Sequence, residues 1–134
     1  MLIKVLKSVA DPAKQAERDR YANFFGSTRS LVVIAIEMFP GKVVFWLDHA
    51  GVLMSVRSDL VDIVDGSLSS WWRVSTRSGR LFIGPPEIAS EDFDVDPTGR
   101  SEASNAAYAL ARARIFEEAE KIDPEAHDVR RFRR

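Results

Sequence analysis

The sequence has 134 residues, of which 46% are apolar and 29% charged, and its formal net charge is −1. This length and apolar content suit one hydrophobic core, and two domains would each be too small. The lack of cysteine excludes disulfides, thiolate metal sites and a cysteine nucleophile, and no apolar stretch is long enough to cross a membrane.

The first quarter of the chain predicts a strand and a helix. Residues Met1 to Leu6 suit a strand, and their early lysines do not fit a secretory signal, so we expect a cytoplasmic protein. Asp11 is a suitable N-cap and Pro12 a suitable first helical residue, so a helix should run to about Phe25. Gly26 then suits the C-cap, and the aromatic end of the helix should anchor it.

Three antiparallel strands in meander order should follow the helix. Their predicted ranges are Leu31–Phe39, Lys42–Asp48 and Val52–Arg57. If Pro40 and Gly41 form a two-residue loop, Phe39 lies opposite Lys42. One face of this hairpin is then apolar and is the predicted core; it carries Val32, Ile34, Ile36, Met38, Val43, Phe45 and Leu47. The opposite face is mixed, which suits partial cover by helices or by a partner.

The second half of the chain predicts a further hairpin and a long helix. Residues Ser58–Asp65 fit either a short helix or an irregular edge strand. The hairpin should comprise Ser69–Arg77 and Arg80–Gly84, and an acidic loop follows from Glu87 to Gly99. Ser101 should cap a helix that reaches about Lys121.

These elements together predict an α+β fold. We expect a two-layer sandwich, in which the N-terminal and C-terminal helices pack on an antiparallel sheet of about five or six strands. Residues 1–125 should form one domain, and residues 126–134 a basic C-terminal tail. The tail is either frayed or a contact for nucleic acid or an acidic protein surface.

The predicted Ser78-Gly79 hairpin has two contrasting faces because side chains alternate along a strand. One face is apolar and carries Trp72, Val74, Thr76, Leu81 and Ile83. The other carries rings and guanidinium groups, and its members are Trp71, Arg73, Ser75, Arg77, Arg80 and Phe82. Such side chains are enriched at protein interfaces and also stack on nucleic-acid bases. The alternative is that another element covers the two rings.

The acidic loop contains a second candidate contact. Its carboxylates are Glu87, Glu91, Asp92, Asp94 and Asp96. Alternating aspartates resemble the start of a calcium loop, but Pro97 replaces its required glycine and Ala103 its final glutamate. We therefore expect no metal and no cofactor. The loop is either a solvated segment before a helix or a contact for a basic partner.

No pattern of residues predicts catalysis. The chain lacks a phosphate-binding glycine loop, a His-Glu metalloprotease pattern and a G-x-S-x-G motif. His49 follows Asp48 at a predicted turn, which is more typical of a surface residue than of a general base. A pocket built from Trp46, Glu37 and Asp48 is a further possibility, but we expect no enzyme activity.

The leading functional hypothesis is a small intracellular protein-binding module, with a bacterial inhibitor or immunity-type protein as its specific form. Its predicted contacts are Trp71, Arg73, Arg77, Arg80, Phe82, Glu91, Asp92, Asp94 and Asp96. The second hypothesis is a nucleic-acid-binding accessory protein that uses the arginine and aromatic face of the hairpin. We expect no membrane partner.

Removal of a large side chain from the predicted core face tests the hairpin interpretation. Phe45→Ala or Ile34→Ala should lower the free energy of unfolding by about 2–5 kcal/mol, because either substitution leaves a cavity. Chemical denaturation of each variant beside the original chain measures the loss. Near-neutral values for both variants would show that the opposite face forms the core.

Overall fold

The chain folds around one antiparallel sheet with helices at its sides. The computed structural model describes residues 1–49, 51–89 and 93–126. Its strands are β1 (Leu2–Val5), β2 (Leu31–Phe39), β3 (Lys42–His49), β4 (Val52–Arg57), β5 (Val61–Asp65), β6 (Arg73–Arg77) and β7 (Arg80–Gly84). Its helices are α1 (Pro12–Phe25), α2 (Pro86–Ala89) and α3 (Glu102–Ile122), with short 3₁₀ turns η1 (Ser58–Leu60) and η2 (Pro97–Gly99). The predicted α+β class is confirmed, and the two-layer packing stays a prediction.

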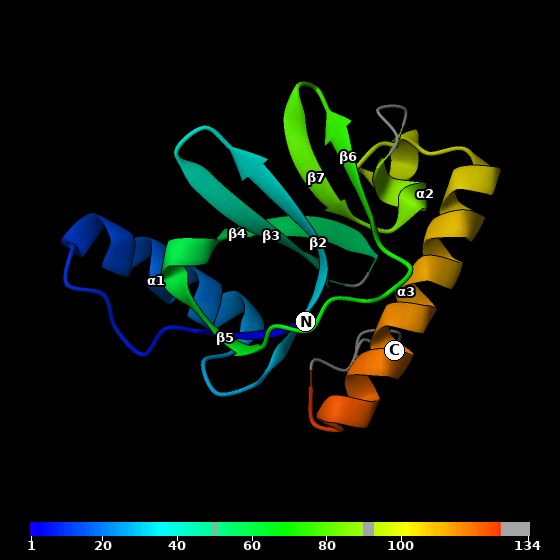
Figure 1. Ribbon diagram of the computed structural model, residues 1–134. Helices are drawn as coiled ribbons and strands as arrows, with labels where there is room; N and C mark the ends of the chain where they lie inside the picture. The colour runs from blue at the N-terminus through cyan, green and yellow to red at the C-terminus, as the bar shows by residue number, and fades with distance from the viewer. Residues whose placement is uncertain (50, 90–92, 127–134) are drawn as a thin grey trace.

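Strand β2 lies at the centre of the sheet and has neighbours along its whole length. The strand order is β4-β3-β2-β1-β5, and β7 pairs with both β2 and β6. The start of β2 pairs with β1, and its end pairs with β7 on the same edge. Figure 1 shows the consequence, since the β6–β7 hairpin extends beside the β2–β3 hairpin.

The β2–β3 hairpin has the predicted two-residue loop. Phe39 lies opposite Lys42, and Gly41 adopts a positive φ of 79° that favours glycine. The pairing also places Ile36 opposite Phe45, as predicted. The register shifts between Val33 and Ala35, so the prediction for the far end of the hairpin is wrong by one residue. A bulge of this kind adds one residue to one strand only.

Both sides of β2 are covered, which makes this strand the middle of the core. Burial is continuous from Leu31 to Glu37. Ile34 and Phe45, on the predicted core face, are both buried. Glu37 belongs to the face predicted to be mixed, and it is buried as well. Continuous burial is typical of a strand with cover on both faces.

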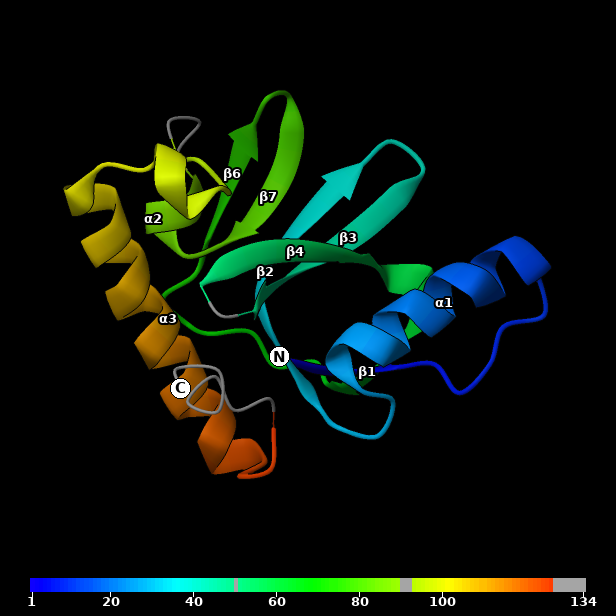
Figure 2. The same cartoon turned by 180° about the vertical axis from the view of Figure 1, so that it is seen from behind.

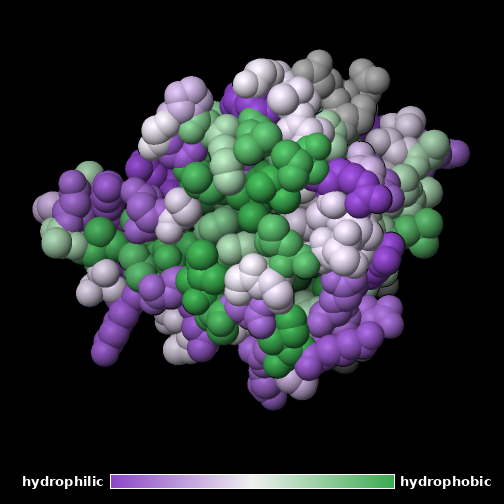
Figure 3. Space-filling view, viewed as in Figure 1, coloured by the Kyte–Doolittle hydropathy of each residue, from purple (hydrophilic) through white to green (hydrophobic). Residues whose placement is uncertain are grey.

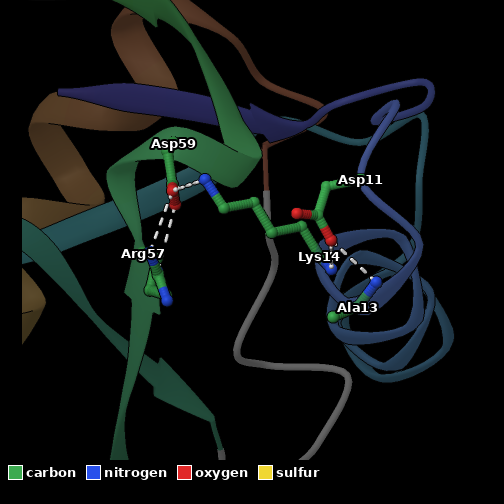
Figure 4. Close-up of polar contacts among 5 residues, drawn as sticks. All are labelled: Asp11, Ala13, Lys14, Arg57 and Asp59. Atoms are coloured by element: carbon green, nitrogen blue, oxygen red, sulfur yellow. Dashed lines mark hydrogen bonds and ion pairs between the residues drawn. The ribbon is translucent and has the colours of Figure 1, made fainter.

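Helix α1 matches its prediction at both ends. Asp11 caps it by accepting hydrogen bonds from the backbone of Ala13 at 2.9 Å and Lys14 at 3.3 Å. Figure 4 shows this cap together with the ion pair from Lys14 to Asp59, which also binds Arg57. Both cations share one carboxylate, so the contact links the start of α1 to η1 and the end of β4.

The other end of α1 is its apolar anchor, as predicted. Phe25 is buried, and the Phe24 ring lies 4.3 Å from the ring of His49 at the end of β3. In Figures 1 and 2, α1 lies towards β1 and β5, whereas α3 lies along the side of β6 and β7. No described helix combines the length and the apolar character needed to span a membrane.

Helix α3 begins as predicted, since the Ser101 hydroxyl accepts a hydrogen bond from the backbone of Ser104 at 3.1 Å. Its buried face carries Tyr108, Ala111, Ile115 and Ala119. Ile122, predicted for the same face, is exposed. The small alanines let the helix approach the sheet closely.

Three segments after β4 show detail that the sequence left open or missed. Residues Ser58–Asp65, which the sequence left open between a short helix and an irregular edge strand, form the 3₁₀ turn η1 and then strand β5 at the end of the strand order. The predicted strand Ser69–Arg77 begins only at Arg73, because Ser69 accepts a backbone hydrogen bond from Trp72 in a turn. The acidic loop contains α2 and η2, which the many helix-breaking residues concealed.

The close approach of β7 to β2 predicts intolerance of a side chain at Gly84. An added Cβ would lie 2.8 Å from the Cβ of Ala35 and 3.1 Å from the ring of Phe82. Gly84→Ala should therefore lower the free energy of unfolding by about 1–3 kcal/mol in urea denaturation. Gly66→Ala is the matched control, because its nearest neighbour lies at an ordinary 3.6 Å. Equal stability of the two variants would contradict the pairing.

Candidate functional site

The β6–β7 hairpin keeps the predicted alternation but exposes the other face. Phe82 is only 1% exposed, whereas Val74 is 65% exposed. Pairing with β2 places Phe82 beside Glu37, and α2 packs on both strands of the hairpin. The prediction of an outward ring at Phe82 is therefore wrong. The reason is that alternation separates two faces, while contacts from distant segments decide which face is buried.

Arg80 forms an ion pair with a buried carboxylate. Its Nε lies 3.0 Å from Oε2 of Glu37, whose other oxygen accepts a hydrogen bond from Nε1 of Trp46 at 3.3 Å. The guanidinium also lies 4.4 Å from the ring centre of Phe39. Glu37 is almost fully buried, so Arg80 compensates a charge inside the fold. This arginine stabilises the sheet.

Arg77 is also used inside the molecule. It donates hydrogen bonds to the backbone oxygens of Ile88 at 3.2 Å and Phe93 at 2.7 Å. These contacts connect the hairpin to α2 and to the segment after it. A guanidinium that donates to two carbonyl groups has fewer donors left for a partner.

Trp71 lies against α3. Its Nε1 donates to Oε1 of Glu118 at 2.8 Å, and the guanidinium of Arg114 lies 4.4 Å from its ring centre. The ring is half-buried, so it is not the free outward ring that alternation predicted. Arg73 is exposed and donates to the backbone oxygens of Trp71 and Trp72 at 3.3 and 3.2 Å.

The described carboxylates of the acidic loop are exposed, whereas its apolar residues Ile88 and Phe93 are buried. Asp94 accepts a hydrogen bond from the backbone of Asp96 at 2.9 Å, and Asp96 accepts two from Thr98. The hydrogen bond from the Thr98 backbone lowers the pKa of Asp96 below its ordinary value. Glu91 and Asp92 lie outside the described residues. The predicted contacts with a partner at this loop stay a prediction.

Another buried carboxylate joins the sheet to α3. Asp48 is fully buried and accepts hydrogen bonds from the hydroxyl of Tyr108 and from the backbone of Gly51. Arg112 lies 3.0 Å away as an ion pair, although its Nε–H is not aligned for a hydrogen bond. Burial and the Asp48 carboxylate raise the pKa of Tyr108, so its hydroxyl remains a donor. The sequence contained one signal for this cluster, since Arg112 follows Tyr108 by one helical turn.

The suggested pocket of Trp46, Glu37 and Asp48 is contradicted by their packing. Glu37 and Asp48 are buried, and each is paired with an arginine. Asp48 binds α3, whereas His49 contacts the aromatic end of α1, so these neighbours do not act together. Among the residues that the structure describes, no three acidic or histidine side chains are placed to hold a metal ion.

One surface that the contacts above do not explain is apolar. We call it the apolar sheet face and define it by Met38, Val43, Val74, Leu81 and Ile83. Direct pairs place Met38 opposite both Val43 and Leu81, and Val74 opposite Ile83. Leu81 and Met38 are 39% and 37% exposed. Figure 3, viewed as Figure 1, shows hydrophobic side chains gathered over the region of the two hairpins.

This surface reverses the predicted roles of the two faces along β6 and β7, although Trp72, just before β6, is buried as predicted. Val74, Leu81 and Ile83 belong to the face predicted to be buried. They continue the core face of the β2–β3 hairpin, whose end at Met38 is uncovered. None of the five side chains is charged, so the surface provides apolar contact and no acid, base or nucleophile.

Comparison with protein-family models, with curated proteins and with solved structures finds no match to this chain.

The contact between α3 and the segment before β6 predicts a specific pH dependence. Burial alone raises the pKa of Glu118, but hydrogen bonds from Ser69 and Trp71 and the charge of Arg114 outweigh it and lower the pKa. The stabilisation is thus complete above the ordinary carboxylate pKa and is lost as the pH falls through the lowered pKa.

Glu118→Gln should accordingly be less stable than the original chain at pH 7, and the difference should shrink towards about pH 3. Urea denaturation at both pH values measures it. The exposed neighbour Glu117 supplies the matched control, because Glu117→Gln should show no such dependence. A Glu118→Gln difference that is the same at both pH values would refute the assignment.

Proposed function

We propose that the chain is a small protein-binding module whose contact surface is the apolar sheet face. The observation that supports this is the exposure of Met38, Val74 and Leu81 on one face of neighbouring strands. Monomeric proteins rarely expose large contiguous apolar patches, and such patches commonly mark interaction sites. Interface cores are also depleted of charged side chains, as this face is.

Protein binding is the function that the sequence also suggested, but the proposed contact surface is now the apolar sheet face and not the face with arginines and aromatic rings. Arg77, Arg80 and Trp71 each bind groups of the same chain, so they are occupied in the free protein. The apolar sheet face has no corresponding cover from α1, α2 or α3 at Val74 and Leu81. An inhibitor or immunity-type role is the specific form of this proposal, in which the bound partner is neutralised.

Nucleic-acid binding receives less support. A stacking site needs accessible rings, and Phe82 is buried while Trp71 is held by Glu118. Exposed Arg73 remains on this side of the hairpin, but one cation provides little electrostatic affinity. The arginines of the predicted basic tail lie outside the described residues. The proposal also includes a cytoplasmic location and no catalytic role, both of which are expectations from the sequence.

A charge placed in the apolar sheet face should abolish partner binding. Val74→Asp buries an unpaired carboxylate in the proposed interface, which should weaken binding at least about tenfold, or about 1.4 kcal/mol. Leu110→Asp is the matched control, because Leu110 is 75% exposed on α3 and lies outside the face. Tagged versions of all three chains, incubated with lysate of the native host, are compared by quantitative mass spectrometry.

The expected result is one set of proteins retained by the original chain and Leu110→Asp and reduced at least about tenfold with Val74→Asp. Thermal unfolding verifies that both variants are folded. Equal retention by Val74→Asp, or no specific retention by any chain, would rule out the apolar sheet face as a binding surface.

A further inference from the structure

A polar pocket lies between β1, the turn before β2 and the chain after α3. Its volume is about 360 Å³, within the range that small-molecule sites occupy. The lining residues are Lys4, Thr28, Arg29, Ser30, Asp123 and Glu125. It shares no residue with the apolar sheet face, so an inference from it is independent of the proposed function.

The pocket contains charges of both signs that do not neutralise one another. Lys4 and Arg29 supply two cations, and Asp123 and Glu125 supply two carboxylates. All four residues lie in the described part of the chain, and no nitrogen of either cation comes within 4.0 Å of either carboxylate as an ion pair. Within the described part of the chain, the charges of the pocket have no ion pair with one another, so charged groups of either sign line the same cavity.

The fold fixes the backbone positions of the residues that carry these charges. Lys4 belongs to strand β1, which is paired on both edges. Arg29 and the buried Ser30 directly precede β2. Asp123 ends α3, and one of its carboxylate oxygens accepts a hydrogen bond from the backbone of Glu125 at 2.9 Å. The cations of the pocket therefore come from β1 and the segment before β2, and its carboxylates come from the chain after α3.

The pattern of charge selects a class of ligand. A simple anion would face two carboxylates, and a simple cation would face two basic side chains, so each would be partly repelled. A molecule with one charge of each sign satisfies both sides. The guanidinium of Arg29 suits a carboxylate, because it offers parallel N–H donors, and the carboxylates suit an ammonium group. The hydroxyls of Thr28 and Ser30 add hydrogen-bonding groups at the pocket wall.

We propose that this pocket binds a free α-amino acid. Its carboxylate contacts Lys4 and Arg29, and its ammonium group contacts Asp123 and Glu125. The remaining volume accommodates the side chain of the amino acid.

Glycine and its two halves provide a direct test. Glycine carries both charges, whereas acetate and methylammonium each carry one, so the three probes separate recognition of a zwitterion from simple ion binding. The full chain labelled with ¹⁵N is titrated with each probe up to about 10 mM, and amide shifts are followed by NMR. L-alanine and L-glutamine, titrated in the same way, report whether the pocket accepts a side chain.

The expected result is saturable shifts at Lys4, Ser30 and Glu125 with glycine and the larger amino acids, and affinity at least about tenfold weaker for acetate and methylammonium. Arg29→Gln and Glu125→Gln should each weaken glycine binding by a similar factor. Lys7→Gln and Arg20→Gln are matched controls, since both residues are exposed and outside the pocket, and should leave the affinity unchanged.

Three results would overturn the proposal. The first is the absence of saturable shifts with any amino acid. The second is acetate or methylammonium binding as tightly as glycine, which would indicate a simple ion site. The third is unchanged affinity in both Arg29→Gln and Glu125→Gln, with spectra showing that these variants are folded.

Discussion

The pairing of β7 with the last residues of β2 is the constraint on which the rest of the structure depends. It places Phe82 beside Glu37 on one side of the sheet and Leu81 beside Met38 on the other. The first side gains its cover from α2 and its charge compensation from Arg80. The second side has no such cover and becomes an apolar surface. One set of backbone hydrogen bonds thus decides both which side chains are buried and which apolar side chains stay exposed.

Features set by neighbouring residues could be predicted from the sequence. The caps of α1 and α3 depend on Asp11 and Ser101, each next to the helix it begins. The loop at Pro40-Gly41 depends on the conformational preferences of two residues, and it fixes Phe39 opposite Lys42. In each case the deciding interaction spans only a few residues, so the pattern contains the information needed.

Features set by distant residues could not be predicted in the same way. Alternation along the β6–β7 hairpin places Phe82 and Val74 on opposite faces. In the sequence, the face with the arginines resembles a solvent-exposed face, and only the pairing with β2 shows that Glu37 lies opposite Phe82. The register shift after Val33 is equally hidden, because a bulge depends on both strands. The polar pocket combines three segments from opposite ends of the chain, and no spacing in the sequence connects them.

The two buried carboxylates have a consequence for how the chain acquires its structure during synthesis. Glu37 and Asp48 lie in the first half of the chain, whereas their partners Arg80, Tyr108 and Arg112 are 43 or more positions later. A nascent chain that ends after β5 has the central hairpin without these partners, and its carboxylates must stay hydrated. The central strands therefore cannot complete their packing until α3 has left the ribosome. The packing of the central strands in this sense waits for α3, although the core strands are made early.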